Sequence, residues 1–359
     1  MPATPASTSD GLPAAADLPP MIDWDFAVSL GSRIAGEGPT VTRAEADDAV
    51  AELRAGAGRS TGLVREFTGL DAPDGTAPIL VVDRPGWVQA NAEGFEVATR
   101  PMIEKLVASK PPSGLSLRVG SKITGAEVGG LLGFLAGKVL GQFDPFHAPH
   151  GRLLLVAPNI VHVERELDVD PTDFRLWVCL HEETHRVQFT AVPWMRDHLF
   201  SEIRAISDAV EPTTFVDGGL ERLTEAIRSG RKGGSLVEMF STPEQREILD
   251  RVTGMMSLLE GHADVVMDDV GPSVIPSVDQ IRRRFTQRRQ GVGTLDRLLR
   301  RLLGLEAKMA QYRDGAKFVR SVVDKVGMEE FNAVWAAPEH LPSKAELSDP
   351  NGWVTRVLG

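Results

Sequence analysis

The sequence has little cysteine, little tyrosine and no long apolar run. Its single cysteine, Cys179, excludes an internal disulfide framework and any zinc site built from several cysteines, so a bound metal would use histidine and carboxylate ligands. Acidic residues outnumber basic ones, and the net charge of −11 argues against a general affinity for nucleic acid or anionic membranes. The 359 residues are 42% hydrophobic, enough for a sizeable globular core.

The first twenty residues have neither a basic start nor an apolar segment. They are rich in Pro, Ala, Ser and Asp, a composition typical of disordered chain and unlike a signal peptide or a transmembrane segment. We therefore expect a disordered tail over residues 1–20, a folded domain over residues 21–359 and a cytoplasmic location.

Five glycines recur at every fourth position in GAEVGGLLGFLAGKVLG, from Gly125 to Gly141. On a helix they would form one face along which a second backbone can approach closely, as in the small-residue faces of membrane helices. Glu127 and Lys138 confine the uncharged run to ten residues, whereas a membrane-spanning helix needs roughly 20. The pattern therefore favours a tightly packed internal helix over membrane insertion.

A helix is predicted over residues 171–190, after an apolar strand at 152–160. Asp170 is a suitable N-cap, Pro171 suits the first helical position, and the helix should end before Pro193. Three- and four-residue spacing defines its buried face. The residues predicted to lie on that face are Phe174, Trp177, Val178, His181, His185 and either Gln188 or Phe189.

The pentapeptide HEETH lies on this helix. His181 and His185 are four residues apart and point to the same side, so their imidazoles could occupy two corners of a zinc tetrahedron. Glu182 could take a proton from a water molecule at an open corner. The same pattern also arises by chance, so a catalytic site needs a third ligand elsewhere in the chain.

The third ligand is expected on a second helix, which starts at a capping box at Thr242 and runs to about Met267. Glu260 and His262 lie about 200° apart around this helix, so only one of them can reach the metal. We prefer Glu260, because Asp264 follows one turn later and could accept the free N–H of a zinc-bound histidine. No such partner is expected for His262.

Other histidines are weaker candidates. A longer motif with glycine at 188 and histidine at 191, typical of the metzincins, is excluded by Gln188 and Ala191. His198 lies beyond the predicted helix end and shares no face with the motif. His147 and His150 are three residues apart in a loop rich in Pro and Gly, where a helical ligand pair cannot form.

Two further features allow both a functional and a structural interpretation. Tyr312 is the only tyrosine and could stabilise the oxyanion during amide hydrolysis, although a half-buried structural tyrosine is the commoner case. The arginine-rich segments at 281–290 and 297–301 could contact nucleic acid or a substrate carboxylate. Solvated helix faces more often have this composition.

These motifs resemble one known family. HEETH followed on a later helix by E-x-x-x-D is similar to the gluzincin pattern, and several other segments resemble the type 2 zincin-like metallopeptidases of high-GC bacteria. The resembling segments are MIDWDFA, PNI, DFRLWVCLHEETHRVQFTAVPWMRDHL, LLEGHADVVMD, AQYRDGAKFV and LPSKAELSDPNGW. The resemblance covers about residues 21–359 and implies a hydrolase with His181, His185 and Glu260 as zinc ligands and Glu182 as general base. Some members are linked to deazaflavin-coenzyme biosynthesis, but nothing in this sequence indicates flavin chemistry.

We therefore predict an α+β, predominantly helical zincin-like fold, with a small sheet beside the active-site helix that includes strands at 79–83 and 152–160. A cleft is expected between the region up to about residue 190 and the helical remainder. The predicted function is Zn²⁺-dependent hydrolysis of a peptide or amide bond in a peptide or protein substrate, with no nucleic-acid partner. The alternative is a binding or scaffold protein that retains zinc without proteolysis.

Overall fold

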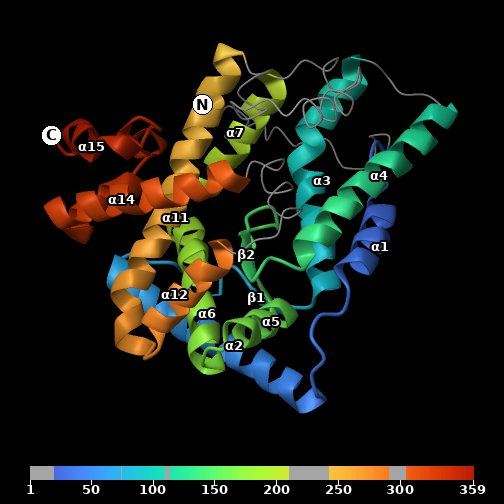
Figure 1. Cartoon of the computed structure of the whole chain (residues 1–359). Coiled ribbons are helices and arrows are strands. Elements are labelled where there is room, and N and C mark those ends of the chain that lie inside the picture. Colours follow the sequence, from blue (N-terminus) through green and yellow to red (C-terminus); the bar gives the residue numbers. More distant parts are fainter. Residues whose placement is uncertain (1–19, 74, 110–113, 210–241, 291–304) are drawn as a thin grey trace, which may run out of the picture.

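The computed structural model describes residues 20–73, 75–109, 114–209, 242–290 and 305–359. Within these ranges, only the backbone is described for residues 114–116, 289–290 and 305–313. The described chain is predominantly helical with a small sheet, which confirms the predicted fold class (Figure 1). In chain order the elements are α1 (Trp24–Ala35), α2 (Arg43–Thr68), β1 (Ile79–Val82), α3 (Arg84–Ser109), α4 (Gly114–Ala136), β2 (Gly141–Asp144), β3 (Arg152–Val156), α5 (Ala157–Leu167), α6 (Pro171–Ala191), α7 (Met195–Ala209), α11 (Pro243–Val274), α12 (Val278–Gln290), α14 (Leu305–Phe331), η2 (Asn332–Trp335), η3 (Pro338–His340), η4 (Glu346–Ser348) and α15 (Pro350–Val357).

The sheet has the strand order β1-β3-β2. β1 is parallel to β3, β2 is antiparallel to it, and all five residues of the central strand β3 are buried. In Figure 1 the helices α1, α3 and α4 lie on one side of this sheet, and α11, α14 and α15 lie on the other. Because β2 is an edge strand, its outer side has no β-partner among the described residues.

The predicted strand at 79–83 is confirmed, but the one at 152–160 was predicted too long. β3 ends at Val156, and α5 begins at the next residue with Pro158 in its first turn, where the missing N–H breaks no helical hydrogen bond. The amide of Asn159 donates to the carbonyls of Ala136 and Val139, at 2.7 and 2.6 Å. These bonds hold the strand-to-helix turn, and their two acceptors lie 23 and 20 positions away in the sequence.

The glycine face of α4 packs directly against the backbone of α1. A Cβ atom at Gly129 would lie 2.5 Å from the carbonyl oxygen of Ala27, and one at Gly133 would lie 2.7 Å from that of Gly31. The predicted internal helix is therefore confirmed, although it ends at Ala136 and leaves the last two glycines of the repeat outside it. No helix in the described ranges has both the length and the apolar content to span a bilayer.

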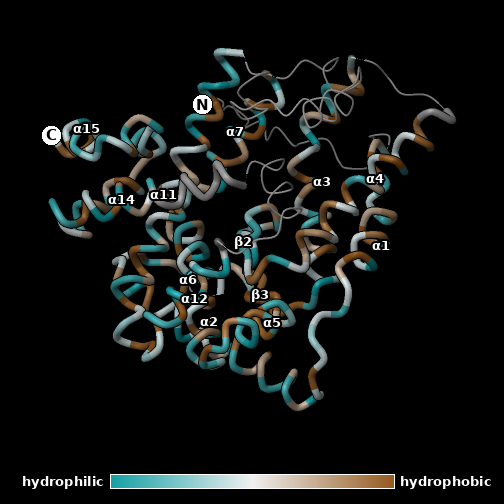
Figure 2. Tube along the Cα trace, viewed as in Figure 1, coloured by the Kyte–Doolittle hydropathy of each residue, from teal (hydrophilic) through white to brown (hydrophobic). Residues whose placement is uncertain are grey.

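The main hydrophobic core lies between α2, α6, α11 and α14. It contains Leu53 of α2, Phe174 and Leu180 of α6, Leu258 of α11 and Phe318 of α14, all with no solvent exposure. In Figure 2 the tube at β3 is brown, the colour of high hydropathy, whereas brown and teal stretches alternate along the helices. This core fixes α6 against α11, the two helices that the sequence predicts to contribute metal ligands.

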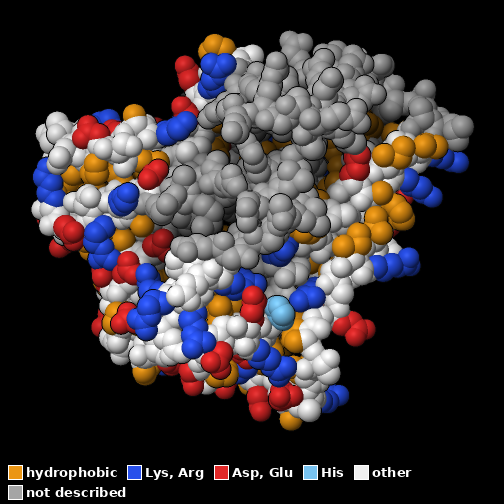
Figure 3. Space-filling view, viewed as in Figure 1, with side chains coloured by type: hydrophobic (Ala, Val, Ile, Leu, Met, Phe, Trp, Pro, Cys, Tyr) orange, Lys and Arg blue, Asp and Glu red, His pale blue; other side chains and the backbone are white. Residues whose placement is uncertain are grey.

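Arginines on α12 form ion pairs with neighbouring helices. Arg288 pairs with Glu166 at 2.7 Å, and Arg284 both pairs with Asp168 and donates to the carbonyl of Leu167. Figure 3 shows basic and acidic side chains interspersed over the lower part of the visible face. This favours the solvated-face interpretation of the segment 281–290, whereas 297–301 and residues 1–19 of the predicted tail lie outside the described residues.

Candidate metal centre

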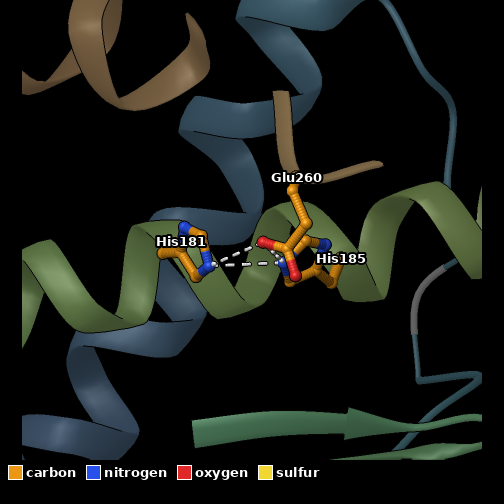
Figure 4. A group of neighbouring side chains, drawn as sticks. All are labelled: His181, His185 and Glu260. Atoms are coloured by element: carbon orange, nitrogen blue, oxygen red, sulfur yellow. Dashed lines mark hydrogen bonds and ion pairs between the residues drawn. The ribbon is translucent and has the colours of Figure 1, made fainter. Parts of the chain in front are cut away.

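Helix α6 forms as its capping residues predict. The Asp170 carboxylate accepts from the backbone N–H of Asp173 at 2.9 Å, Pro171 is the first helical residue, and the helix ends at Ala191. Four residues on a helix span slightly more than one turn, so His181 and His185 lie on the same side of α6 (Figure 4). Their rings meet edge to face, with centroids 4.8 Å apart.

A carboxylate from α11 completes a cluster with these two histidines. Glu260 Oε2 lies 3.4 Å from Nε2 of His185 and 3.6 Å from Nε2 of His181, while the two Nε2 atoms are 3.3 Å apart. Figure 4 shows the three side chains pointing toward one another from the two helices. The structure thus brings together the three residues that the sequence proposes as ligands.

The spacing of these three atoms fits a tetrahedral zinc ion. With zinc–ligand bonds of about 2.0–2.1 Å, two ligand atoms of a tetrahedral site are about 3.3–3.4 Å apart. The donor set of two imidazole nitrogens and one carboxylate oxygen is also typical of catalytic zinc, which keeps one corner open. The His181 side chain is 24% exposed, against 13% for His185, so solvent can reach the cluster on the His181 side.

Close helix packing positions Glu260. Helix α11 starts at the predicted capping box of Thr242 and Gln245, but it runs to Val274 and is longer than predicted. Directly after Glu260, Gly261 faces the backbone of Gly315 on α14 with no room for a Cβ atom. Helices α11 and α14 are therefore in backbone contact at Gly261. This contact fixes the position of α11, and with it the position of Glu260 against α6.

The electrostatics of the cluster favour a positive charge. Burial disfavours the imidazolium form of His185, but attraction and hydrogen bonding by the Glu260 carboxylate outweigh burial and raise the pKa of His185 to about 9. An imidazole beside a buried carboxylate, like His185 beside Glu260, binds a cation readily, whether a proton or a metal ion. Burial acts without such compensation at His262 and lowers its pKa to about 3.

Glu182 and Glu183 point to different surroundings. The Glu182 side chain is buried against the first residue of β2, Gly141, and its residue is only 8% exposed. Glu183 accepts hydrogen bonds from Arg186 and Thr61, at 2.8 and 3.0 Å, and so links α6 to α2. Of the two adjacent glutamates, Glu182 therefore lies by the sheet edge, and Glu183 serves the helix packing.

The sequence did not predict the groups that lie next to the Nδ1 atoms of the two histidines, on the side away from the cluster. Nδ1 of His185 lies 3.0 Å from Gln188 Oε1, and Nδ1 of His181 lies 3.2 Å from Met267 Sδ. His262 is fully buried outside the cluster, and its Nδ1 lies 3.0 Å from Gln188 Nε2, a contact that the sequence did not predict. The only sequence signal for Gln188 was its place on the buried face of α6.

The other residues that the sequence analysis considered for a functional role lie in different parts of the structure. Asp264 is half-buried one turn after Glu260, and its role as a partner of a ligand histidine stays a prediction. The backbone of Tyr312 lies on α14, but its side chain is outside the described residues. His198 lies on α7 at 4.0 Å from Glu202 of the same helix, and His150 is exposed in the β2–β3 loop.

The match to known proteins agrees with this geometry. Residues 22–354 match the zincin-like metallopeptidase family. The chain belongs to this family. It is also similar to a crystal structure from Chloroflexus aurantiacus, described as a candidate hydrolase with a novel fold, at 33% identity and a TM-score of 0.69 over 93% of this chain and 98% of that one. No curated protein matches the chain.

Membership confirms the resemblance drawn from the motifs. The zincin-like family and the hydrolase-like relative support a metallohydrolase, and the family implies a metal, usually zinc. The cluster of His181, His185 and Glu260 is a group of residues able to hold such an ion.

Proposed function

We propose that this zincin-like protein is a zinc-dependent peptidase that acts on a peptide or protein in the cytoplasm. The observation that carries the proposal is the cluster of three ligand atoms separated by 3.3, 3.4 and 3.6 Å, with Glu182 directly after His181 on α6 and acting electrostatically on His185. Zinc held there would supply Lewis-acid chemistry, which activates water and polarises a carbonyl group.

The cluster and two further residues would then have different roles in the reaction. His181, His185 and Glu260 would hold the ion, as three protein ligands do in catalytic zinc sites. Glu182 takes the proton from the attacking water and passes it to the leaving amine, as a general base and then a general acid. Tyr312 on α14 stays the candidate for stabilising the oxyanion.

The position of β2 favours an extended peptide as substrate. β2 pairs only with β3 within the described sheet, so its outer side offers backbone N–H and C=O groups to a further strand. Its first residue, Gly141, contacts the Glu182 side chain. A peptide that paired with β2 would therefore pass close to the general base, in the cleft predicted between the two parts of the chain.

The ligand assignment is tested by metal analysis of the purified protein. The wild type should hold about one zinc per chain, and His181→Ala and Glu260→Ala should lose most of it, because each removes one of three ligands. His198→Ala is the matched control, since this histidine lies on α7 beside Glu202 and outside the cluster. Full zinc retention in either ligand variant would disprove the assignment.

The enzymatic role is tested by Glu182→Gln. This variant keeps the shape of the side chain but removes the base, so it should retain zinc and lose cleavage of a peptide library by at least about 100-fold. Tyr312→Phe should lower the rate with zinc retained if its hydroxyl stabilises the oxyanion. Zinc binding without cleavage by the wild type would instead favour the binding or scaffold function.

A further inference from the structure

Gln188 of α6 is a fully buried amide that touches three separate groups. Its Oε1 lies 3.0 Å from Nδ1 of His185, and its Nε2 lies 3.0 Å from both the carbonyl oxygen of Leu259 and Nδ1 of His262. One side chain therefore connects a candidate ligand on α6 to α11, at the residue directly before Glu260.

The three contacts together determine where the protons lie. A backbone carbonyl only accepts, so the amide end that faces Leu259 must be the NH₂ group. The opposite end is then the carbonyl oxygen, and Nδ1 of His185 must carry the proton that it donates to this oxygen. In neutral His185 the lone pair is left on Nε2, the atom that faces His181 and Glu260.

The same reasoning gives the opposite tautomer for His262. The second hydrogen of the Gln188 amide points to Nδ1 of His262, which must therefore accept. In the neutral ring the proton is then on Nε2. The rings of Phe331 and Trp335 pack against the His262 imidazole, with centroids 5.9 and 5.3 Å away. This packing fixes the position of the accepting atom, Nδ1 of His262.

We propose that Gln188 is a positioning residue of the metal centre. It fixes the tautomer and ring orientation of His185, and it joins that ring to the α11 backbone beside Glu260. Two ligands from different helices are thereby held in one arrangement by a single amide. This inference rests on the proposed function, because the positioning matters only if the cluster binds zinc. The competing interpretation is that Gln188 only satisfies buried polar groups between two packed helices.

Zinc affinity of Gln188→Leu separates these interpretations. The variant removes all three contacts, and loss of an outer partner of a ligating histidine typically weakens metal binding 10–100-fold. Thr184→Val is the control, because Thr184 is equally buried on α6 and its hydroxyl donates to the Leu180 carbonyl of its own helix. Affinities are measured by competition with a zinc chelator, and the melting temperature of the metal-free forms reports the structural cost of each change.

We expect zinc binding to weaken about 10–100-fold in Gln188→Leu and to stay unchanged in Thr184→Val. Wild-type affinity in Gln188→Leu, or an equal loss in both variants, would overturn the proposal. A wild type that binds no zinc would instead overturn the proposed function and this inference with it, so the two failures are distinguishable.

Nitrogen-15 spectra of zinc-loaded wild-type protein provide a test that needs no variant. The proton of His185 should be on Nδ1, and that of His262 on Nε2, as the amide orientation requires. Any other pair of tautomers in a zinc-binding wild type would overturn the assigned role of Gln188, even if Gln188→Leu were to fail to fold.

Discussion

Gly141, the first residue of β2, lies directly against the side chain of Glu182. A Cβ atom at position 141 would lie 2.5 Å from Cγ and 2.7 Å from Cδ of this glutamate, closer than van der Waals contact allows. The edge strand can therefore approach Glu182, the proposed general base, only because residue 141 has no side chain. The contact holds the Glu182 carboxylate on the side of α6 that faces the sheet.

Gly141→Ala should lower turnover without removing the metal. The added methyl group must displace the Glu182 carboxylate, and a displacement of about 1 Å in a reacting group can lower a rate on the order of 100-fold. The three atoms nearest to this methyl all belong to Glu182, and none belongs to a proposed ligand, so zinc content should stay at the wild-type level. Peptide-library cleavage and metal analysis check the two expectations.

Gly130→Ala is the control for this prediction. A Cβ atom at Gly130, on α4, would meet no atom within 4 Å, so its turnover should equal that of the wild type. Undiminished cleavage by Gly141→Ala would show that Glu182 either does not act in the reaction or tolerates the shift.

Neighbouring glycines on α4 should respond oppositely to alanine. At Gly129 a Cβ atom would lie 2.5 Å from the carbonyl oxygen of Ala27, so Gly129→Ala must push α1 and α4 apart, at about 1–3 kcal/mol. At Gly130 the methyl group meets only open space, and alanine in a helix is more stable than glycine by roughly 0.5–1 kcal/mol. Urea unfolding should show a lower midpoint for Gly129→Ala only, and equal midpoints would argue against the backbone contact.

Local signals in the sequence were sufficient to predict the helix that holds the two histidines. Asp170 and Pro171 fix where α6 begins, and the spacing of His181 and His185 fixes their common side, so no distant residue is needed. The glycine face of α4 was predictable for the same reason, because its period is a property of the helix itself. These features depend only on neighbours within a few residues along the chain.

Features that depend on distant partners were not predictable. The spacing of the glycines predicted that Gly141 lies on the glycine face of a helix, whereas it is the first residue of β2. Its place in the fold depends on pairing with β3 and on contact with Glu182, both of which are distant in sequence. Gln188 could be placed on the buried side of α6, but its contact with Leu259 requires α11 to be in position. The contact between His262 and Gln188 also joins two helices that are distant in sequence, and the sequence did not predict it.

Zinc should stabilise the fold by joining α6 to α11. A ligand that binds only the folded protein stabilises it by about 2.7 kcal/mol at a free concentration 100 times the dissociation constant. Zinc should therefore raise the melting temperature of the wild type, and a chelator should reverse the shift. Glu260→Ala should melt at the same temperature with and without zinc, because it cuts the link from α11. An equal zinc-induced shift in this variant would place the ion elsewhere.

The C-terminal region should lose stability in acid through Glu346. Burial acts against ionisation of this carboxyl, but hydrogen bonds from Arg356 and from Ser343 outweigh it and lower the pKa of Glu346. A pKa lower in the folded than in the unfolded state stabilises the protein above the unfolded pKa, and the stabilisation is lost as pH falls through the folded pKa. Glu346→Gln should therefore melt below the wild type at pH 7, and the difference should shrink in acid. A difference that persists at low pH would contradict the ionic contribution.

Cys179 provides a probe of the packing that supports the candidate metal centre. Its thiol is fully buried, burial raises its pKa, and its Sγ lies 3.5 Å from the Leu53 carbonyl where α6 meets α2. Thiolate is the reactive form, so a thiol reagent should label the native protein very slowly and one site per chain after denaturation. Labelling should also slow when zinc is added, because metal bound to His181 and His185 on the same helix opposes its opening. Rapid labelling of the native protein would contradict the tight α2–α6 contact, whereas a rate that zinc leaves unchanged would show that this contact opens independently of the metal centre.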